Sequence, residues 1–330
     1  MDVKLKLLNE DTIYEHLFER YSFLQKHAES LKQDLGIVSR SDASLELNFE
    51  PPDKKTCHRA ETFSFELSQS LSALNSSQDN SNSTTGYVVW TTTPFFLQWL
   101  LYSEAGRIFT IGGSIDCEDE PSSSTCEIPA MFSSSSIEIE DQQFHQVIEL
   151  GCGVCGILGI ALGNYVDKYV YTDQKALLNR LKNNIAHNID ELRLRNVTST
   201  TLGFDSRRKT PLQIQIDVLS LDWETFNANP TKIDSLLKPN RTANVSIVSM
   251  DVVYNEYLIE PYLKTLSSLL EYYERMGHVP NALLGIQLRD QDVVERFLEC
   301  AIIDYHLKVY VIMDPVIEVT RFGLYYIKLQ

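Results

Sequence analysis

Two groups of residues in this chain have types and spacings that could perform chemistry together. In the first, Gly151, Gly153 and Gly156 follow a short apolar run that contains Glu149, and the next strand-like run ends on Asp173. In a strand–turn–helix–strand unit, glycines let the backbone approach a ligand, and the start of the helix offers free N–H groups. A carboxylate at the tip of the second strand accepts hydrogen bonds from ribose hydroxyls. The pattern therefore predicts a nucleotide site.

The glycine spacing leaves two classes of nucleotide open. Residues 151–156 spell G-x-G-x-x-G, which is typical of a dinucleotide site, so an NAD-dependent oxidoreductase is one interpretation. Glu149 argues against it, because a carboxylate there would repel a pyrophosphate but can meet the ammonium of a bound amino-acid moiety. The second group, Asp251 and Tyr254, follows the apolar strand 245–250 at the sheet edge where ligands of such folds sit.

Cys152 and Cys155 form a C-x-x-C pair, which raises a redox or zinc site as a further alternative. Cys117 and Cys126 would have to complete a zinc site, and their spacing fits no common zinc finger. Since the pair lies inside the glycine turn, small side-chain size is enough to explain it, and we predict no metal.

The elements that must position these residues alternate between strands and helices after Asp173. We expect helices at 175–190, 256–276 and 290–303, and strands at 212–221, 245–254, 282–288, 307–313 and 321–329. Before the glycine turn we expect a helix at 10–33, strands at 44–50, 62–70 and 87–90, a helix opening at Thr92 and Thr93 before Pro94, and loops at 51–60, 75–86 and 118–136. The alternation predicts a parallel sheet covered by helices on both faces, with the last two strands forming an antiparallel hairpin.

Composition narrows the partners. The chain carries 29 Lys and Arg against 45 Asp and Glu, a net charge of −16. Such a chain is a poor non-specific binder of nucleic acid, and its charge suits either a basic protein partner or solubility alone. Six scattered cysteines, the lack of a signal-peptide h-region and the lack of an apolar run of about 18 residues predict an intracellular protein that does not enter a membrane.

Four motifs together resemble a known family. ELGCGVCG at 149–156, TDQ at 172–174, LDW at 221–223 and MDVVYNEYLIEP at 250–261 resemble the S-adenosylmethionine-dependent protein-lysine methyltransferases of methyltransferase family 16. TIYEHLFERY at 12–21, residues 82–96 and residues 251–266 are similar to a fungal branch of that family that acts on ribosomal proteins. The resemblance implies an α/β, Rossmann-like class I methyltransferase fold at 141–330, with a mostly parallel seven-stranded sheet and an antiparallel last strand. An α+β extension at 1–140 would pack on this core and contribute to the cofactor and substrate sites.

The same resemblance implies roles around the glycine turn. Gly151, Cys152 and Gly153 should pack against the methionine end of the cofactor, with Glu149 near its ammonium, and Asp173 should hold the ribose hydroxyls. The chain departs from the family's usual E-x-G-x-G-x-G because a cysteine, Cys155, stands where the third glycine would fall. Two alternatives remain open: Glu149 as a buried, satisfied carboxylate, and Asp173 as a cap of the following helix.

Other roles implied by the resemblance fall outside the turn. Trp223 should border the adenine, Met250 should line the same pocket, and Trp90 should reach over the cofactor. Asp251 should anchor the incoming lysine amine while Tyr254 narrows its channel, neither acting as a dedicated general base. Enzymes of this fold that methylate amide or base nitrogens usually carry prolines at this point, and DVVY has none. The tryptophans as ordinary core residues and the Asp–Tyr pair as a structural hydrogen bond remain alternatives.

We therefore predict a protein-lysine N-methyltransferase whose substrate is a large-subunit ribosomal protein, the L1 stalk protein. A non-catalytic adaptor of the same fold that binds a basic ribosomal partner is the second hypothesis, and the oxidoreductase is the third. We expect no direct nucleic-acid binding, and a cytoplasmic location with the nucleus as a second one.

Overall fold

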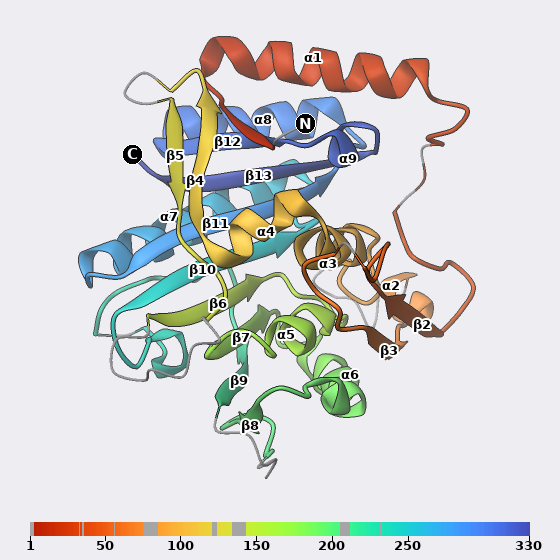
Figure 1. The fold of residues 1–330 in the computed structure, drawn as a ribbon, viewed down its shortest axis with the longest axis vertical. Helices are drawn as coiled ribbons and strands as arrows, with labels where there is room; N and C mark the ends of the chain where they lie inside the picture. Colours follow the sequence, from red (N-terminus) through yellow and green to blue (C-terminus); the bar gives the residue numbers. More distant parts are fainter. Residues whose placement is uncertain are drawn as a thin grey trace.

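A single large sheet organises the chain (Figure 1). The computed structural model describes residues 3–330 except 33, 35, 56, 76–84, 121–123, 134–142, 205–211 and 232. Within these residues, eleven strands form the sheet in the order β5-β4-β1-β12-β13-β11-β10-β6-β7-β9-β8.

The centre of this sheet is the predicted seven-stranded core. Its strands are β6 (Phe144–Leu150), β7 (Lys168–Asp173), β9 (Gln213–Ser220), β10 (Ala243–Met250), β11 (Val279–Gln287), β12 (Leu307–Met313) and β13 (Phe322–Leu329). The strands β9, β7, β6, β10 and β11 are mutually parallel, and β13 lies antiparallel between β11 and β12. β6 and β7 are buried along their whole length, as expected of strands covered on both faces. The predicted class I arrangement is confirmed.

Four further strands extend the sheet at its two edges. β8 (Asn196–Thr198) pairs with β9, and at the other edge β1 (Lys4–Leu7) pairs antiparallel with β12. β4 (Gly113–Glu118) and β5 (Thr125–Ile128) then follow β1. The prediction of a surface loop at 118–136 was wrong for the residues of β5, which form a strand in which Cys126 and Ile128 are buried. Acidic and serine residues around this short strand obscured its alternation.

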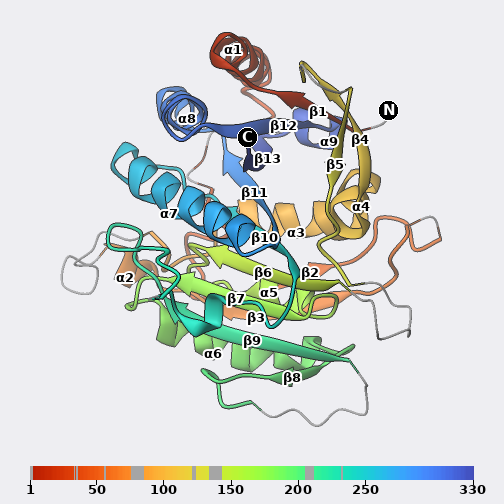
Figure 2. The same cartoon turned by 90° about the vertical axis from the view of Figure 1, so that its left-hand side faces the viewer.

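Helices cover both faces of the sheet (Figure 2). On one face, α1 (Glu10–Lys26), α7 (Glu256–Arg275) and α8 (Gln291–Glu299) share one hydrophobic cluster with the strands. On the other face lie α3 (Thr92–Tyr102), α4 (Glu104–Ile111), α5 (Ile157–Leu162) and α6 (Leu178–Asn188). The short α9 (Pro315–Glu318) connects β12 to β13, and α8 continues into a π-helical turn at Cys300–Asp304. No helix among the described residues is long and apolar enough to cross a membrane.

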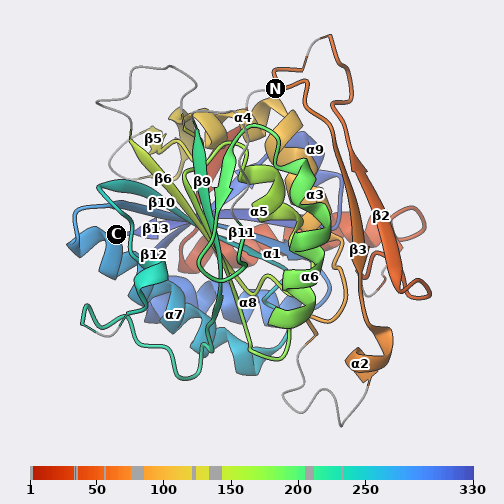
Figure 3. The same cartoon turned by 90° about the horizontal axis from the view of Figure 1, so that it is seen from below.

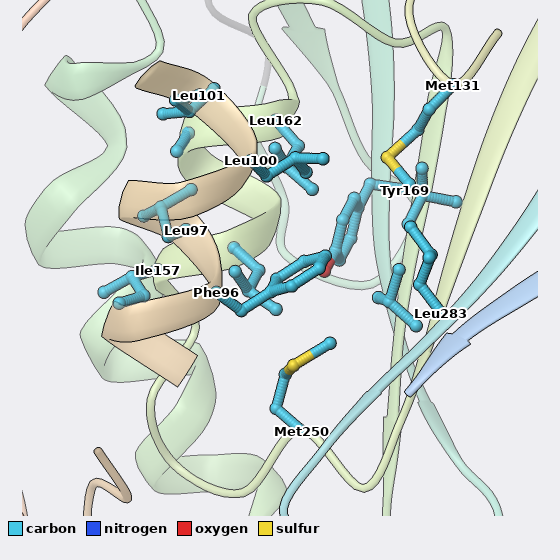
Figure 4. Packing of buried hydrophobic residues seen from close by; sticks show 14 of the residues in the cluster. Phe96, Leu97, Leu100, Leu101, Met131, Ile157, Leu162, Tyr169, Met250 and Leu283 are labelled. Carbon is cyan, nitrogen blue, oxygen red and sulfur yellow. The ribbon is translucent and has the colours of Figure 1, made fainter. Parts of the chain in front are cut away.

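Local signals account for the helix starts. Asn9 accepts hydrogen bonds from the amides of Asp11 and Thr12 at the start of α1. Pro94 stands in the first turn of α3, as predicted. α3 then packs Phe96, Leu97, Leu100 and Leu101 against α5, β10 and β11 (Figure 4).

The predicted strands at 44–50 and 62–70 form a separate hairpin of β2 (Ser44–Phe49) and β3 (Phe63–Ser68). β3 lies beside α6 (Figure 3), and Asn184 and Asn188 of α6 accept hydrogen bonds from the amides of Ser68 and Glu66, each at 2.9 Å. After the short α2 (Leu71–Asn75), most of the predicted loop at 75–86 lies outside the described residues. The predicted strand at 87–90 was wrong, because only an isolated bridge joins Trp90 to Ile37.

The predicted division of the chain at residue 140 stays a prediction. The part before it contributes β1, β4 and β5 to the same sheet as the part after it.

Candidate active site

A pocket lies at the carboxyl ends of the central parallel strands. Four of its walls come from residues that end or follow β6, β7, β9 and β10: Gly151, Cys152, Gly153, Asp173, Gln174, Leu221, Asp222, Trp223, Met250, Asp251, Val252 and Tyr254. A fifth wall comes from the segment before α3, with Thr85, Gly86, Val88 and Trp90, and from Thr93 in its first turn. In open α/β sheets this edge is where ligands bind. Two widely separated parts of the sequence therefore build one pocket.

The glycine turn after β6 adopts backbone conformations that favour glycine. Gly151, Gly153 and Gly156 have φ of +76°, +57° and +73°. A Cβ on Gly151 would come within 2.6 Å of Val252 Cγ1, so this glycine also leaves room for a neighbouring wall of the pocket. Gly156 is the N-cap of α5, which shows that the late third glycine begins the helix.

Asp173 holds the turn in place. Its Oδ2 accepts a hydrogen bond from the Gly153 amide at 2.7 Å, and its Oδ1 accepts one from the Gln174 amide at 2.6 Å. Burial raises the pKa of this carboxyl to about 6, and the two backbone hydrogen bonds oppose the rise, so the group is ionised at neutral pH. Asp173 does not cap α6, whose N-cap is Leu177.

Glu149 lies beneath the turn, outside the residues that line the pocket. Its side chain is almost fully buried, and the Tyr169 hydroxyl donates a hydrogen bond to Oε2 at 2.7 Å. Burial raises the pKa of the carboxyl to about 8, so the group is mostly protonated at neutral pH. Glu149 thus matches the alternative of a buried, satisfied carboxyl, and its contact with a cofactor ammonium stays a prediction.

The three side chains predicted to surround a cofactor all line the pocket. Trp90 donates from Nε1 to the Thr85 carbonyl at 3.1 Å. The Trp223 and Tyr262 rings pack edge to face, with centroids 5.2 Å apart, and the outer edge of the Trp223 ring lies next to Gly151. Met250 ends β10 next to Gly285. Their assigned contacts with a cofactor stay predictions, but the fold brings them together.

Asp251 and Tyr254 also line the pocket, yet their side chains are already engaged. The Asp251 carboxylate has no exposed surface. Both of its oxygens accept hydrogen bonds from the Arg289 guanidinium, and the bond to Oδ1 is 2.8 Å long. Oδ1 also accepts a hydrogen bond from the backbone amide of Gln287 at 3.2 Å. Tyr254 forms hydrogen bonds with Thr85, and burial raises the pKa of its hydroxyl. The predicted contact of Asp251 with an amine stays a prediction.

The sequence patterns did not identify Arg289 as a residue of the site. It follows the carboxyl end of β11, next to the end of β10, and its guanidinium lies 5.0 Å from the centroid of the Trp90 ring. A charged residue directly after an expected parallel strand is the signal that could have revealed it.

A second, open hollow adjoins the pocket. It is lined by Asp34, Arg40, Tyr254, Arg289, Asp290, Gln291 and Asp292. Tyr254 lines both cavities, so the hollow and the pocket meet at this side chain.

The cysteines of the turn are buried free thiols. Burial raises the pKa of Cys155 to about 12 and that of Cys152 well above its usual value, which favours the protonated thiol. Within the described ranges, no group of three or more His, Cys, Asp or Glu side chains could hold a metal ion.

Comparison with known proteins gives consistent matches. Residues 69–220 match the family model described as lysine methyltransferase. A protein named ribosomal lysine N-methyltransferase 5 from Lachancea thermotolerans is 58% identical over 100% of both chains. Proteins of the same name from Kluyveromyces lactis and Saccharomyces cerevisiae strain AWRI796 are 43% and 39% identical, each covering 99% of this chain and 100% of the relative. Among solved structures, the match to a human methyltransferase 10 domain containing protein covers 58% of this chain and 74% of that protein's chain, at 10% identity and a TM-score of 0.32.

Proposed function

This chain belongs to the lysine methyltransferase family, alongside relatives named ribosomal lysine N-methyltransferase 5, and we propose that it methylates a lysine of a large-subunit ribosomal protein with S-adenosylmethionine as the methyl donor. It is a protein-lysine methyltransferase. The donor, the ribosomal substrate and its identity as the L1 stalk protein are the proposed parts.

One observation carries the choice of donor. The glycine turn, the ionised Asp173 and the Trp223 ring lie in the walls of a single pocket. The left-handed glycines form a cradle that a Cβ at Gly151 would fill, and an ionised carboxylate is suited to a ribose diol. These features fit a nucleoside that carries an amino-acid chain. Gly151–Gly153 would meet the methionine end, Asp173 the ribose and Trp223 the base.

S-adenosylmethionine, when bound, supplies a methyl group on a sulfonium, which is already a good leaving group. The chain must therefore hold a neutral lysine amine in line and exclude water. Trp90 and Tyr254 close the pocket on the side of the second hollow, through which the lysine would enter. Since Arg289 covers the Asp251 carboxylate, we propose that the proton of the lysine ammonium leaves to water rather than to that carboxylate.

Purified protein, isotope-labelled S-adenosylmethionine and isolated large ribosomal subunits test this proposal. We expect label on one ribosomal protein, and mass spectrometry should place it on a lysine of the L1 stalk protein. Label on a lysine of another ribosomal protein would overturn the L1 assignment alone, whereas no label on any lysine would overturn the activity toward ribosomes. The Asp173→Ala variant should lose binding of S-adenosylhomocysteine.

The same reagents separate the two alternatives. An adaptor would bind the ribosomal partner without turnover and keep that function in Asp251→Ala and Tyr254→Phe variants. An oxidoreductase would bind NADH and ignore S-adenosylhomocysteine in an equilibrium titration. We also propose a cytoplasmic location, which fluorescence of the tagged chain in cells would test.

A further inference from the structure

Arg289 lies between the two cavities of the site. Its guanidinium lies over the Trp90 ring, and Trp90 lines the cofactor pocket. Arg289 itself lines the second hollow together with Tyr254. The lysine of a substrate that enters from the hollow therefore has to pass this guanidinium.

The ion pair between Asp251 and Arg289 has its cation on the side of the hollow. The Asp251 side chain is completely covered, whereas 18% of the Arg289 side chain remains exposed. Asp251 follows β10 in a left-handed conformation with φ of +62°, and its amide donates to the Gly285 carbonyl at 2.7 Å. Arg289 also donates to Gln287 Oε1 at 2.8 Å. The pair is neutral as a whole, but its positive end faces the hollow.

Other charged and titratable groups surround this end. Asp34 and Arg40 come from the segment between α1 and β2, Asp290 and Asp292 from the start of α8, and Tyr254 from the loop after β10. Tyr21 of α1 also interacts electrostatically with Arg289. The mouth of the hollow thus carries three carboxylates and Arg40, while the wall next to Trp90 carries a fixed guanidinium.

We propose that Arg289 forms the inner wall of the lysine channel and acts there as a fixed cation that disfavours the protonated form of the incoming amine. The inference rests on the proposed methyl transfer to lysine. The acidic mouth attracts an ammonium, and the guanidinium beyond it lowers the pKa of the lysine by like-charge repulsion, so that its proton leaves to water before the amine is held in line. Asp251 is then a positioning residue that acts through Arg289.

The size of the effect follows from Coulomb's law. At an effective dielectric constant of about 20, a cation about 6 Å from the amine with its counter-charge about 3 Å farther away lowers the amine pKa by about 0.7. This shift raises the neutral fraction of the amine about fivefold.

Three variants separate the charge of Arg289 from its contacts. Arg289→Gln removes the cation, and Arg289→Lys retains it. The Asp251→Asn/Arg289→Gln double variant removes both charges, so that no buried carboxylate is left unpaired if the single variant fails to fold. Retained binding of S-adenosylhomocysteine would show that each variant keeps its cofactor pocket.

The first measurement is the pH dependence of kcat with isolated large ribosomal subunits, because kcat reports the pKa of groups in the enzyme–substrate complex. We expect the rising limb to move upward by about 0.7 pH unit in the double variant, by more in Arg289→Gln, where the Asp251 carboxylate is left uncovered, and to stay in place in Arg289→Lys. A double variant that returned to the wild-type profile would assign the shift to an uncovered Asp251 carboxylate and overturn the proposal. An unchanged profile in Arg289→Gln would also overturn it.

The second measurement needs neither turnover nor a ribosomal substrate. Protein saturated with S-adenosylhomocysteine is titrated at pH 7 with n-butylammonium, a mimic of the lysine side chain, and separately with the neutral 1-butanol, both followed by NMR. The double variant should bind n-butylammonium about fivefold more tightly than the wild type and 1-butanol equally well. Equal n-butylammonium affinities would refute the role of Arg289 even where ribosomes are methylated. Tighter n-butylammonium binding by the double variant, together with no methylation of ribosomes, would instead count against the ribosomal substrate alone.

Discussion

The buried Glu149 makes the stability of the chain depend on pH, and Glu149→Gln should remove most of that dependence. Burial raises the pKa of this carboxyl from 4.5 to about 8 in the folded chain. Because the folded value lies above the unfolded one, the full contribution to stability is present below pH 4.5 and is lost as the pH rises through 8. At 1.36 kcal/mol per pKa unit, the loss is about 1 kcal/mol at pH 5.5 and about 4 kcal/mol at pH 8.

Glutamine reproduces the protonated form of this side chain. Its carbonyl oxygen can still accept the hydrogen bond that the Tyr169 hydroxyl donates at 2.7 Å, and it has no charge to bury. Asp173 also has a raised pKa, about 6, but it titrates in both proteins and cancels in their difference. The wild type should therefore lose about 3 kcal/mol more than Glu149→Gln between pH 5.5 and pH 8.

Reversible urea unfolding at the two pH values measures this difference directly. Glu274→Gln, on the exposed surface of α7, controls for the loss of one acidic residue and should follow the wild type. Parallel behaviour of Glu149→Gln and the wild type, within about 1 kcal/mol, would refute the buried, neutral carboxyl.

The same variant tests the predicted contact between Glu149 and the cofactor ammonium. An ammonium placed close to this carboxyl would favour its ionised form, so binding at pH 7 would release a proton. Calorimetric titration of S-adenosylhomocysteine in buffers of different ionisation enthalpy would detect that release in the wild type and its loss in Glu149→Gln. Buffer-independent heats in both proteins would mean that Glu149 is structural.

Three further variants address the turn and its supports. Asp173→Asn should weaken S-adenosylhomocysteine binding by about 1.5–3 kcal/mol in a calorimetric titration, because a charged acceptor is lost. Gly153→Ala should destabilise the fold by about 1–2 kcal/mol in urea unfolding, since φ is +57° and the new Cβ would lie 3.0 Å from the Gly86 carbonyl oxygen. Asn184→Ala should cost about 2–3 kcal/mol in the same assay, because the amide and carbonyl of Ser68 lose their partner.

Sequence periodicity was sufficient for the core strands because burial determines them locally. β6 and β7 are buried at every position, and runs of apolar residues of this kind read as strands covered on both faces. β1 and β4 depend instead on partners far away in the sequence. Lys4–Leu7 pairs with Tyr310–Met313, and Leu5 and Lys6 in turn pair with Cys117 and Glu118. Short half-exposed strands of this type have little local signal, since most of their stability comes from the edge that they extend.

The site divides in the same way. Asp173 could be placed at the ligand edge from the sequence, because it ends an expected parallel strand and such ends meet at one edge. The family resemblance added Trp223 and Met250, and all three line one pocket. The protonated state of the Glu149 carboxyl and the ion pair that covers the Asp251 carboxylate could not be predicted from the sequence. They depend on Tyr169 in the neighbouring strand and on Arg289 beyond β11, and only the register of the folded sheet brings these groups into contact.

The segment before α3 completes the pocket, and this connects cofactor binding to the folding of the N-terminal part. The Val154 amide donates to the Gly86 carbonyl at 2.9 Å, so the glycine turn and this segment hold each other. Asn184 strengthens the connection by donating to the carbonyls of both Val154 and Ser68. A ligand that contacts both the turn and Trp90 binds only the docked arrangement. Its binding free energy must therefore stabilise the docking of this segment, and a change that lowers the docked fraction must lower cofactor affinity in proportion to that fraction.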